Sequence, residues 1–134
     1  MKIEEQVLSI KQMKHLQELG VDTSDASMCW LDFEDNEPME VAVFIPEIML
    51  GYAQYKLYPT YTIGDLIEKL PKEIGIYHLM IDWYLMKIEY TDWSFIETIF
   101  IEFFIINDKP LINTLYDCLC WIAKKHKEFL EVKK

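Results

Sequence analysis

The apolar pattern is strongest in residues 98–106, a nearly continuous run of β-branched and aromatic side chains that Glu102 interrupts. A short run of this kind, closed by the turn-forming residues 107–109, predicts a central strand that is buried on most of both faces. Glu102 either faces water on an open side of the sheet or is a buried acid that needs a partner. The second interpretation makes Glu102 a candidate functional residue.

A helix is expected to follow this strand. Pro110 suits the first turn of a helix, where a missing N–H costs little. The apolar side chains after it recur at helical spacing and form one stripe, which comprises Leu111, Leu115, Cys118, Leu119 and Ile122. In helical phase Trp121 lies at the edge of this stripe, and Cys120 lies on the opposite face. The pattern predicts that this helix packs on a sheet through one face.

A capping-box pattern marks the first helix. The side chains of Ser9 and Gln12 have the spacing at which each can bond the other's backbone N–H. This helix is expected to end at Gly20, because glycine adopts the left-handed conformation that terminates helices. Residues 1–8 precede the cap and are expected to form a short N-terminal turn or arm.

Thr62 and Asp65 have the same spacing, so a second helix is expected to begin at Thr62 and to end before Pro71. Elsewhere the apolar pattern alternates with a period of two. This alternation predicts strands in four further stretches, which are residues 27–33, 40–45, 76–83 and 85–90.

Residues 46–58 have the least regular pattern. Three tyrosines at three-residue spacing favour an amphipathic helix there, closed by Pro59: Tyr52, Tyr55 and Tyr58. If no element is assigned to residues 46–58, the expected order of helices and strands is α-β-β-α-β-β-β-α. This order predicts an α+β fold, with a mainly antiparallel sheet and helices packed on one face. The length predicts one domain, residues 1–134.

Charge narrows the classes of partner. The net charge is −10, and all thirteen basic residues are lysine, so no arginine is present for forked contacts with phosphates or bases. The stretch of residues 15–55 holds nine acidic residues and no lysine. Long-range repulsion disfavours nucleic acid and anionic lipid. We therefore expect a protein partner, with a basic surface, and neither direct nucleic-acid binding nor a membrane.

Targeting and cysteine patterns are consistent with a cytoplasmic protein. No apolar run reaches the ~18 residues that a membrane span needs, and the charged N-terminus lacks the apolar region of a signal peptide. The three cysteines are odd in number, as expected for reduced thiols. Cys118 and Cys120 are two residues apart on a helix, point about 200° from each other and cannot share a metal ion. We expect no cofactor and no metal.

Catalytic motifs are not recognisable in the sequence. The three histidines are dispersed, one to each predicted element, and no glycine-rich phosphate loop occurs. The oxygen-bearing side chains of Asp32, Glu34, Asn36 and Glu37 resemble the opening of a calcium loop, but Glu37 stands where that loop needs glycine. A cleft near Glu102 or His78 would be required for a small enzyme or ligand-binding domain, which is the alternative interpretation.

The leading interpretation is a non-enzymatic interaction module, or an accessory or inhibitor-like factor. Its candidate partner-binding residues are an acidic turn and one tryptophan: Asp32, Glu34, Asp35, Glu37 and Trp121. Tryptophan and tyrosine are favoured at interface centres, so Trp121 is also a candidate contact in a homodimer. A third interpretation is an acidic mimic of nucleic acid, which would need carboxylates spaced like phosphates.

Several stretches are similar to a group of small proteins without an assigned activity, encoded in gut Bacteroidetes genomes and often near mobile elements. The residues that carry this resemblance are spread over the chain: Gln12–Gly20, Thr23-Ser24, Ala26–Trp30, Tyr61–Leu66, Leu70-Pro71, Pro110-Leu111, Leu115-Tyr116 and Leu119–Trp121. The resemblance implies a compact bacterial cytoplasmic domain and a mobile-element setting. It implies no catalytic residue.

Overall fold

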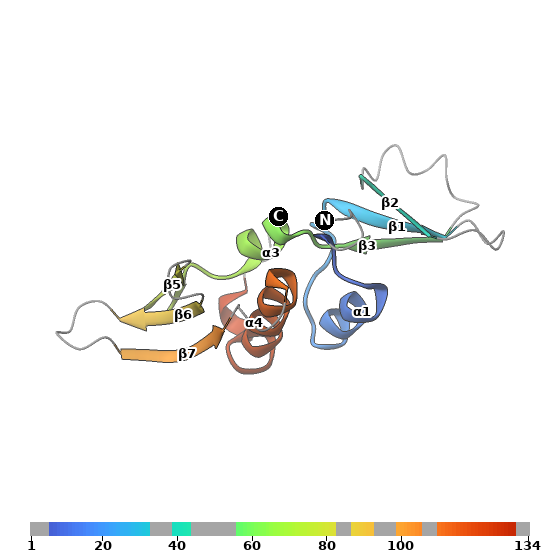
Figure 1. Cartoon of the computed structure of the whole chain (residues 1–134). Coiled ribbons are helices and arrows are strands. Elements are labelled where there is room, and N and C mark those ends of the chain that lie inside the picture. Colours follow the sequence, from blue (N-terminus) through green and yellow to red (C-terminus); the bar gives the residue numbers. More distant parts are fainter. Residues whose placement is uncertain are drawn as a thin grey trace. The chain divides into compact units, whose positions relative to one another are not determined.

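The structure of the chain is a computed structural model (Figure 1). It describes residues 6–32, 39–43, 56–82, 87–92, 99–105 and 110–130, with the backbone alone for residues 99–105. The chain divides into two compact units, unit 1 (residues 1–65) and unit 2 (residues 66–134). Helices and antiparallel strands make up these units, which confirms the α+β class. The expectation of one domain stays a prediction.

Unit 1 contains a helix and a three-stranded antiparallel sheet. Its elements are α1 (Ile10–Glu18), β1 (Met28–Asp32), β2 (Glu40–Val43) and β3 (Lys56–Thr60). The strand order is β2-β1-β3, so β1 is central. Cys29 and Leu31 are buried while their neighbours in β1 are half-buried, as the alternation of side chains along a strand requires.

The predicted cap of α1 is confirmed. Ser9 Oγ accepts a hydrogen bond from the Gln12 backbone N–H at 3.1 Å, and Gln12 Oε1 accepts one from the Ser9 N–H at 3.0 Å. Gly20 follows the helix with a φ of 88°, a conformation that costs glycine little. Met13 and Leu16 form the buried side of the helix.

The predicted helix in residues 46–58 is wrong at its C-terminal end. Tyr58 and Pro59 lie in β3, where they pair with Trp30 and Cys29 of β1. Three-residue spacing of tyrosines does not separate a helix from a strand, and pairing with the central strand decides between them. Pro59 is tolerated because β3 is one of the two outer strands of the described sheet. Tyr52 and Tyr55 lie outside the described residues.

Residues 7 and 8 belong to the core of unit 1 rather than to an arm. Leu8 is fully buried, and its backbone N–H donates to the Tyr61 carbonyl at 3.0 Å. The Leu8 carbonyl accepts two hydrogen bonds, from Trp30 Nε1 at 2.9 Å and from Thr60 Oγ1 at 2.6 Å. The segment before α1 is therefore joined to both β1 and β3.

The second predicted cap is also confirmed, at the start of α3 (Ile63–Lys69). Thr62 Oγ1 accepts from the Asp65 N–H, and Asp65 Oδ2 accepts from the Thr62 N–H, each at 3.0 Å. The same carboxylate oxygen accepts from Ser27, from its N–H at 3.1 Å and its hydroxyl at 2.6 Å. Asp65 thus caps a helix and fixes the residue that precedes β1.

Unit 2 contains a four-stranded antiparallel sheet and the C-terminal helix. Its strands are β4 (Glu73–Ile74), β5 (Tyr77–Asp82), β6 (Lys87–Asp92) and β7 (Ile99–Ile105). They follow the order β4-β5-β6-β7, so β7, predicted as a central strand, is outermost among the strands described. The strands of the chain are divided between two sheets, where one sheet was expected.

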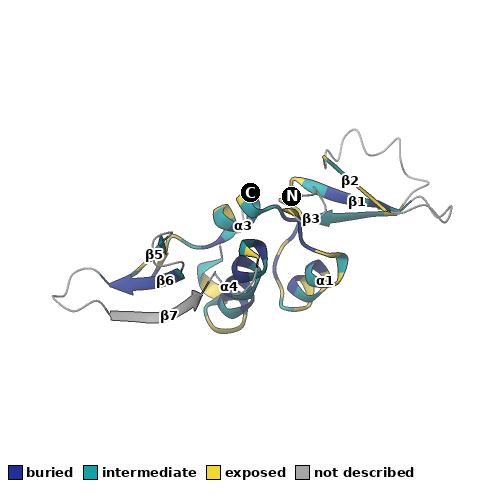
Figure 2. Ribbon diagram, in the orientation of Figure 1, coloured by how far each residue is buried: buried dark blue, intermediate teal, exposed yellow. Residues whose placement is uncertain are grey.

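The helix α4 (Leu111–Lys125) begins after Pro110, as predicted, and leads to the 3₁₀ turn η3 (Lys127–Phe129). Figure 2 shows that much of α4 is buried. Its buried residues are Ile112, Thr114, Leu115, Cys118, Leu119, Cys120, Ile122 and Ala123. At about 100° per residue these positions cover more than half of the helix circumference, which is wider than the predicted stripe.

Asp65→Ala should lower the free energy of unfolding by about 1–3 kcal/mol, because three donors, the half-buried Thr62 N–H and the exposed N–H and hydroxyl of Ser27, lose a charged acceptor. Ser9→Ala removes only a local cap and should cost about 0.5–2 kcal/mol. Urea unfolding of both variants measures the difference. If Asp65→Ala lowers the free energy of unfolding no more than Ser9→Ala does, the hydrogen bonds from Ser27 to Asp65 do not stabilise the fold.

Candidate functional site

The predicted acidic turn lies largely outside the described residues. Asp32 is half-buried at the end of β1, opposite Lys56 of β3. Glu34, Asp35 and Glu37 lie outside the described residues. The partner-binding role of these four acids therefore stays a prediction.

Trp121 is half-buried in unit 2, between two aromatic side chains. Its ring centroid lies 6.0 Å from that of Tyr90 and 4.7 Å from that of His126, the latter in an edge-on arrangement. Tyr90 is fully buried, so Trp121 covers one side of a core residue. These contacts favour a packing role for Trp121, and its role in a homodimer stays a prediction.

The expected cleft would need Glu102 and His78 close together, but they lie on β7 and β5, and β6 lies between these two strands. Glu102 of β7 pairs with Tyr90 of β6, whereas His78 of β5 pairs with Thr91. The side chain of Glu102 lies outside the described residues. His78 instead lies beside Glu73 of β4, with Nδ1 3.5 Å from Glu73 Oε1, and both side chains are well exposed.

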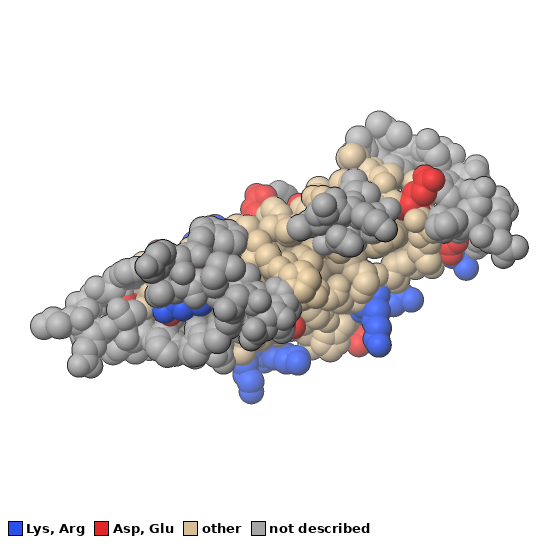
Figure 3. Space-filling model, viewed as in Figure 1, with Lys and Arg blue, Asp and Glu red and all other residues tan. Residues whose placement is uncertain are grey.

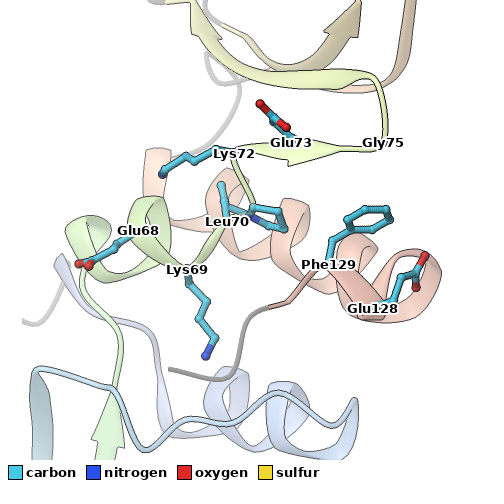
Figure 4. A pocket seen from close by; sticks show the side chains of 9 residues that line it. Glu68, Lys69, Leu70, Lys72, Glu73, Gly75, Glu128 and Phe129 are labelled. Carbon is cyan, nitrogen blue, oxygen red and sulfur yellow. The ribbon is translucent and has the colours of Figure 1, made fainter. Parts of the chain in front are cut away.

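A hollow of about 570 Å³ lies next to Glu73, and all of its lining comes from unit 2. The end of α3, the loop to β4, the β4–β5 hairpin and η3 form its walls (Figure 4). The lining residues are Glu68, Lys69, Leu70, Pro71, Lys72, Glu73, Gly75, Glu128 and Phe129. A hollow of this volume is within the range of small-ligand and peptide pockets.

Hydrogen bonds fix the wall that leads from α3 to β4. The buried Tyr90 hydroxyl donates to the Pro71 carbonyl at 2.7 Å, and burial raises the pKa of Tyr90, which keeps this donor protonated. Lys72 Nζ donates to the Ile67 carbonyl at 2.9 Å, near the C-terminus of α3. That end of a helix has unpaired carbonyls that favour a cation. Leu70, which lies between Ile67 and Pro71 in the sequence, is buried.

The β4–β5 hairpin presents an open strand edge to the hollow. Gly75 has a φ of 61° at the first central position of a two-residue turn, a position that favours glycine. The Leu79 N–H donates to the Lys72 carbonyl at 2.8 Å, so Glu73 and His78 form the adjacent non-hydrogen-bonded pair. The N–H and C=O of Glu73 therefore point away from β5.

The charges around the hollow are mixed, with an acidic excess. Three carboxylates and two ammonium groups line it, and one ammonium group, that of Lys72, bonds the end of α3. Phe129 supplies an aromatic wall, and its ring lies 6.3 Å from that of His126. An apolar wall beside carboxylates is suited to an amphipathic cationic group.

Sequence reasoning missed this hollow. The sequence pattern places Leu70 and Pro71 at the end of a helix and assigns no turn to Gly75. The available signal was Gly75 directly before the predicted strand of residues 76–83, because a glycine at that place is typical of a hairpin turn.

Glu89 is a buried acid that sequence reasoning also missed. Its side chain is 2% exposed, and Oε2 lies 3.2 Å from Lys87 Nζ. These side chains are two residues apart on one strand and share a face, so the opposite charges of Lys87 and Glu89 at this spacing were the signal. Burying this acid together with a cation is consistent with a structural ion pair.

Cys120 is buried, and the prediction that it faces the open side of α4 is wrong. It is 8% exposed, and desolvation raises the pKa of its thiol, as it does for Cys29. The cause is the wide buried surface of α4, which extends beyond the stripe that periodicity identifies. Across the described ranges, no three His, Cys, Asp or Glu side chains come together as a metal site.

Comparisons with known proteins found no matching family model, no similar curated protein and no similar solved structure. In the part of the chain that the structure describes, none of the helices has the length and apolarity required to cross a membrane.

Iodoacetamide should label Cys120 slowly in the folded protein at pH 7–8, because a raised pKa leaves little thiolate. Mass spectrometry of labelled protein tests this. Labelling of the native protein as fast as that of the urea-unfolded protein would show that the thiol is open.

Trp121→Lys should lower the free energy of unfolding by about 1–3 kcal/mol, because the ring contacts with Tyr90 and His126 are lost. Thermal unfolding and light scattering on the same samples separate this role from an interface role. A variant that keeps full stability, while a dimer of the unmodified chain becomes monomeric, would instead place Trp121 in an interface.

Proposed function

We propose that this chain is a non-enzymatic interaction protein and that unit 1 binds a protein partner with a basic surface. The distribution of charge supports this. Residues 1–65 hold four lysines and twelve acidic residues, whereas residues 66–134 hold nine lysines and eleven acidic residues. Unit 1 thus carries −8 of the net charge of −10. A local field of one sign accelerates association with an oppositely charged surface.

Apolar side chains beside this charge are available for affinity. Met39 is 41% exposed and Val43 is 56% exposed, just before and at the end of β2, one of the two outer strands of the described sheet. On the face in view in Figure 3, carboxylate atoms lie over the three-stranded sheet and lysine atoms project from α1. Exposed apolar groups rimmed by charge are typical of interaction surfaces.

The role of an accessory or inhibitor-like factor of a bacterial mobile element, in the cytoplasm, belongs to the same proposal. It is supported by the resemblance of residues such as Gln12–Gly20 and Tyr61–Leu66. An acidic mimic of nucleic acid would also bind a basic partner. Competition by duplex DNA for that partner separates the two roles, because only a mimic occupies the DNA-binding surface of the partner.

Replacing Glu34, Asp35 and Glu37 by lysine should leave the free energy of unfolding nearly unchanged, because the sequence predicts a turn there and charges on a turn in water seldom contribute more than a few tenths of a kcal/mol each. Association with the partner that co-purifies from the native host should slow, and should slow most at low salt, where electrostatic steering is strongest. Surface plasmon resonance over a range of salt concentrations measures this rate.

The neutral variant Glu34→Gln, Asp35→Asn, Glu37→Gln is the matched control and should give an intermediate rate. If the lysine variant unfolds, the segment is structural and the proposal for these residues fails. If it folds and associates at the unmodified rate at every salt concentration, the partner does not meet this acidic turn.

A further inference from the structure

We infer that the hollow of unit 2 is a docking site for an extended peptide segment of a protein partner, in which an apolar residue is flanked by lysine or arginine. This inference goes beyond the proposed role of unit 1, because it concerns other residues and a different kind of contact. It combines three features of the hollow: an apolar wall, an open strand edge and an excess of carboxylates.

The apolar wall gives the peptide side chain a place to bind. Leu70, Pro71 and Phe129 line the hollow, and Phe129 is half-buried. Ile76 follows Gly75 in the hairpin and is 61% exposed, the largest exposure among the large apolar side chains described. Apolar area that remains in water beside a concave wall is typical of a surface that a partner covers.

The open edge of β4 offers hydrogen-bonding groups to the backbone of the peptide. The N–H and C=O of Glu73 point away from β5, and β4 is the outermost strand on its side of the described sheet. An extended peptide that lies along β4 can bond both groups, as in recognition by strand addition. The edge is short, at two residues, so the backbone alone offers little affinity and the side-chain contacts must provide the rest.

The carboxylates select a basic peptide. Glu68, Glu73 and Glu128 line the hollow and are exposed, whereas Lys72 bonds the end of α3. Figure 4 shows Glu128 beside Phe129 at the η3 side of the hollow and Glu73 on β4 across from it. A lysine or arginine stem can pack on Phe129 while its charge reaches Glu128. The lining holds one more carboxylate than ammonium groups, and this excess disfavours an acidic peptide.

The hydrogen bonds that fix the wall hold the site ready for binding. The Tyr90 hydroxyl anchors Pro71, Lys72 anchors the end of α3, and Gly75 sets the hairpin turn. A site that is ordered before binding loses less conformational entropy when a peptide binds.

The test is a titration of the ¹⁵N-labelled full chain with the peptide acetyl-Lys-Val-Lys-Val-Lys-amide, followed by NMR. Saturable shifts are expected at the amides of Glu73, Gly75 and Phe129. The same peptide N-methylated at its central lysine should bind more weakly, because it loses a backbone donor. A peptide with glutamate in place of lysine should not bind.

Two variants with matched controls sharpen the test. Phe129→Ala should weaken binding about five- to thirtyfold, as loss of a central apolar contact does, whereas Leu130→Ala, which truncates a neighbour outside the lining, should not. Glu128→Lys should weaken binding about two- to fivefold, whereas Asp117→Lys, an equal charge reversal on α4, should not. Circular dichroism of each variant verifies that it is folded.

Three results would overturn the inference. They are shifts confined to unit 1, unchanged affinity in folded Phe129→Ala, and equal affinity for the N-methylated peptide. If Phe129→Ala does not fold, the milder Phe129→Leu replaces it, and a smaller loss of affinity is expected because the aromatic wall is removed. The lysine variant of residues 34, 35 and 37 should leave the shifts in unit 2 in place, so failure of this site and failure of the proposed role of unit 1 are distinguishable.

Discussion

Two tyrosine hydroxyls, one in each unit, are buried and must find hydrogen-bond acceptors within the protein. The Tyr61 hydroxyl lies 2.8 Å from the Asp22 carbonyl oxygen and 2.6 Å from Asp25 Oδ1, and the Tyr90 hydroxyl donates to the Pro71 carbonyl. Burial raises the pKa of both tyrosines, and for Tyr61 the Asp25 carboxylate adds to it, so both remain donors. Each bond joins a core residue to a loop, and in unit 2 that loop forms a wall of the hollow.

Local signals allowed part of this fold to be predicted. The caps at Ser9 and Thr62 depend on side chains three residues apart, so the sequence is sufficient to identify them. The start of α4 after Pro110 depends on one residue's fixed geometry. The antiparallel strands follow from alternation, although their division between two sheets does not. Which strands pair is decided by contacts between distant residues.

The features that prediction missed depend on distant contacts. Asp65 bonds Ser27 across 38 positions of the chain, and no local pattern encodes that partner. Cys120 was misplaced because periodicity assumes a helix with one packed face. The hollow brings together the end of a helix, a hairpin and a 3₁₀ turn, whose residues are ordinary in isolation. Its candidate role arises from the arrangement of Leu70, Glu73 and Phe129, which only the folded chain provides.

Pro59 has a further consequence for how unit 1 can associate. An outer strand normally offers a row of free donors that invites edge-to-edge aggregation. Proline has no N–H, and its pairing opposite Cys29 in a regular ladder places its ring nitrogen on the side of β3 away from β1. An added strand would lose a hydrogen bond at that position. Among the described strands of unit 1, an added strand can therefore pair more readily with β2 than with β3.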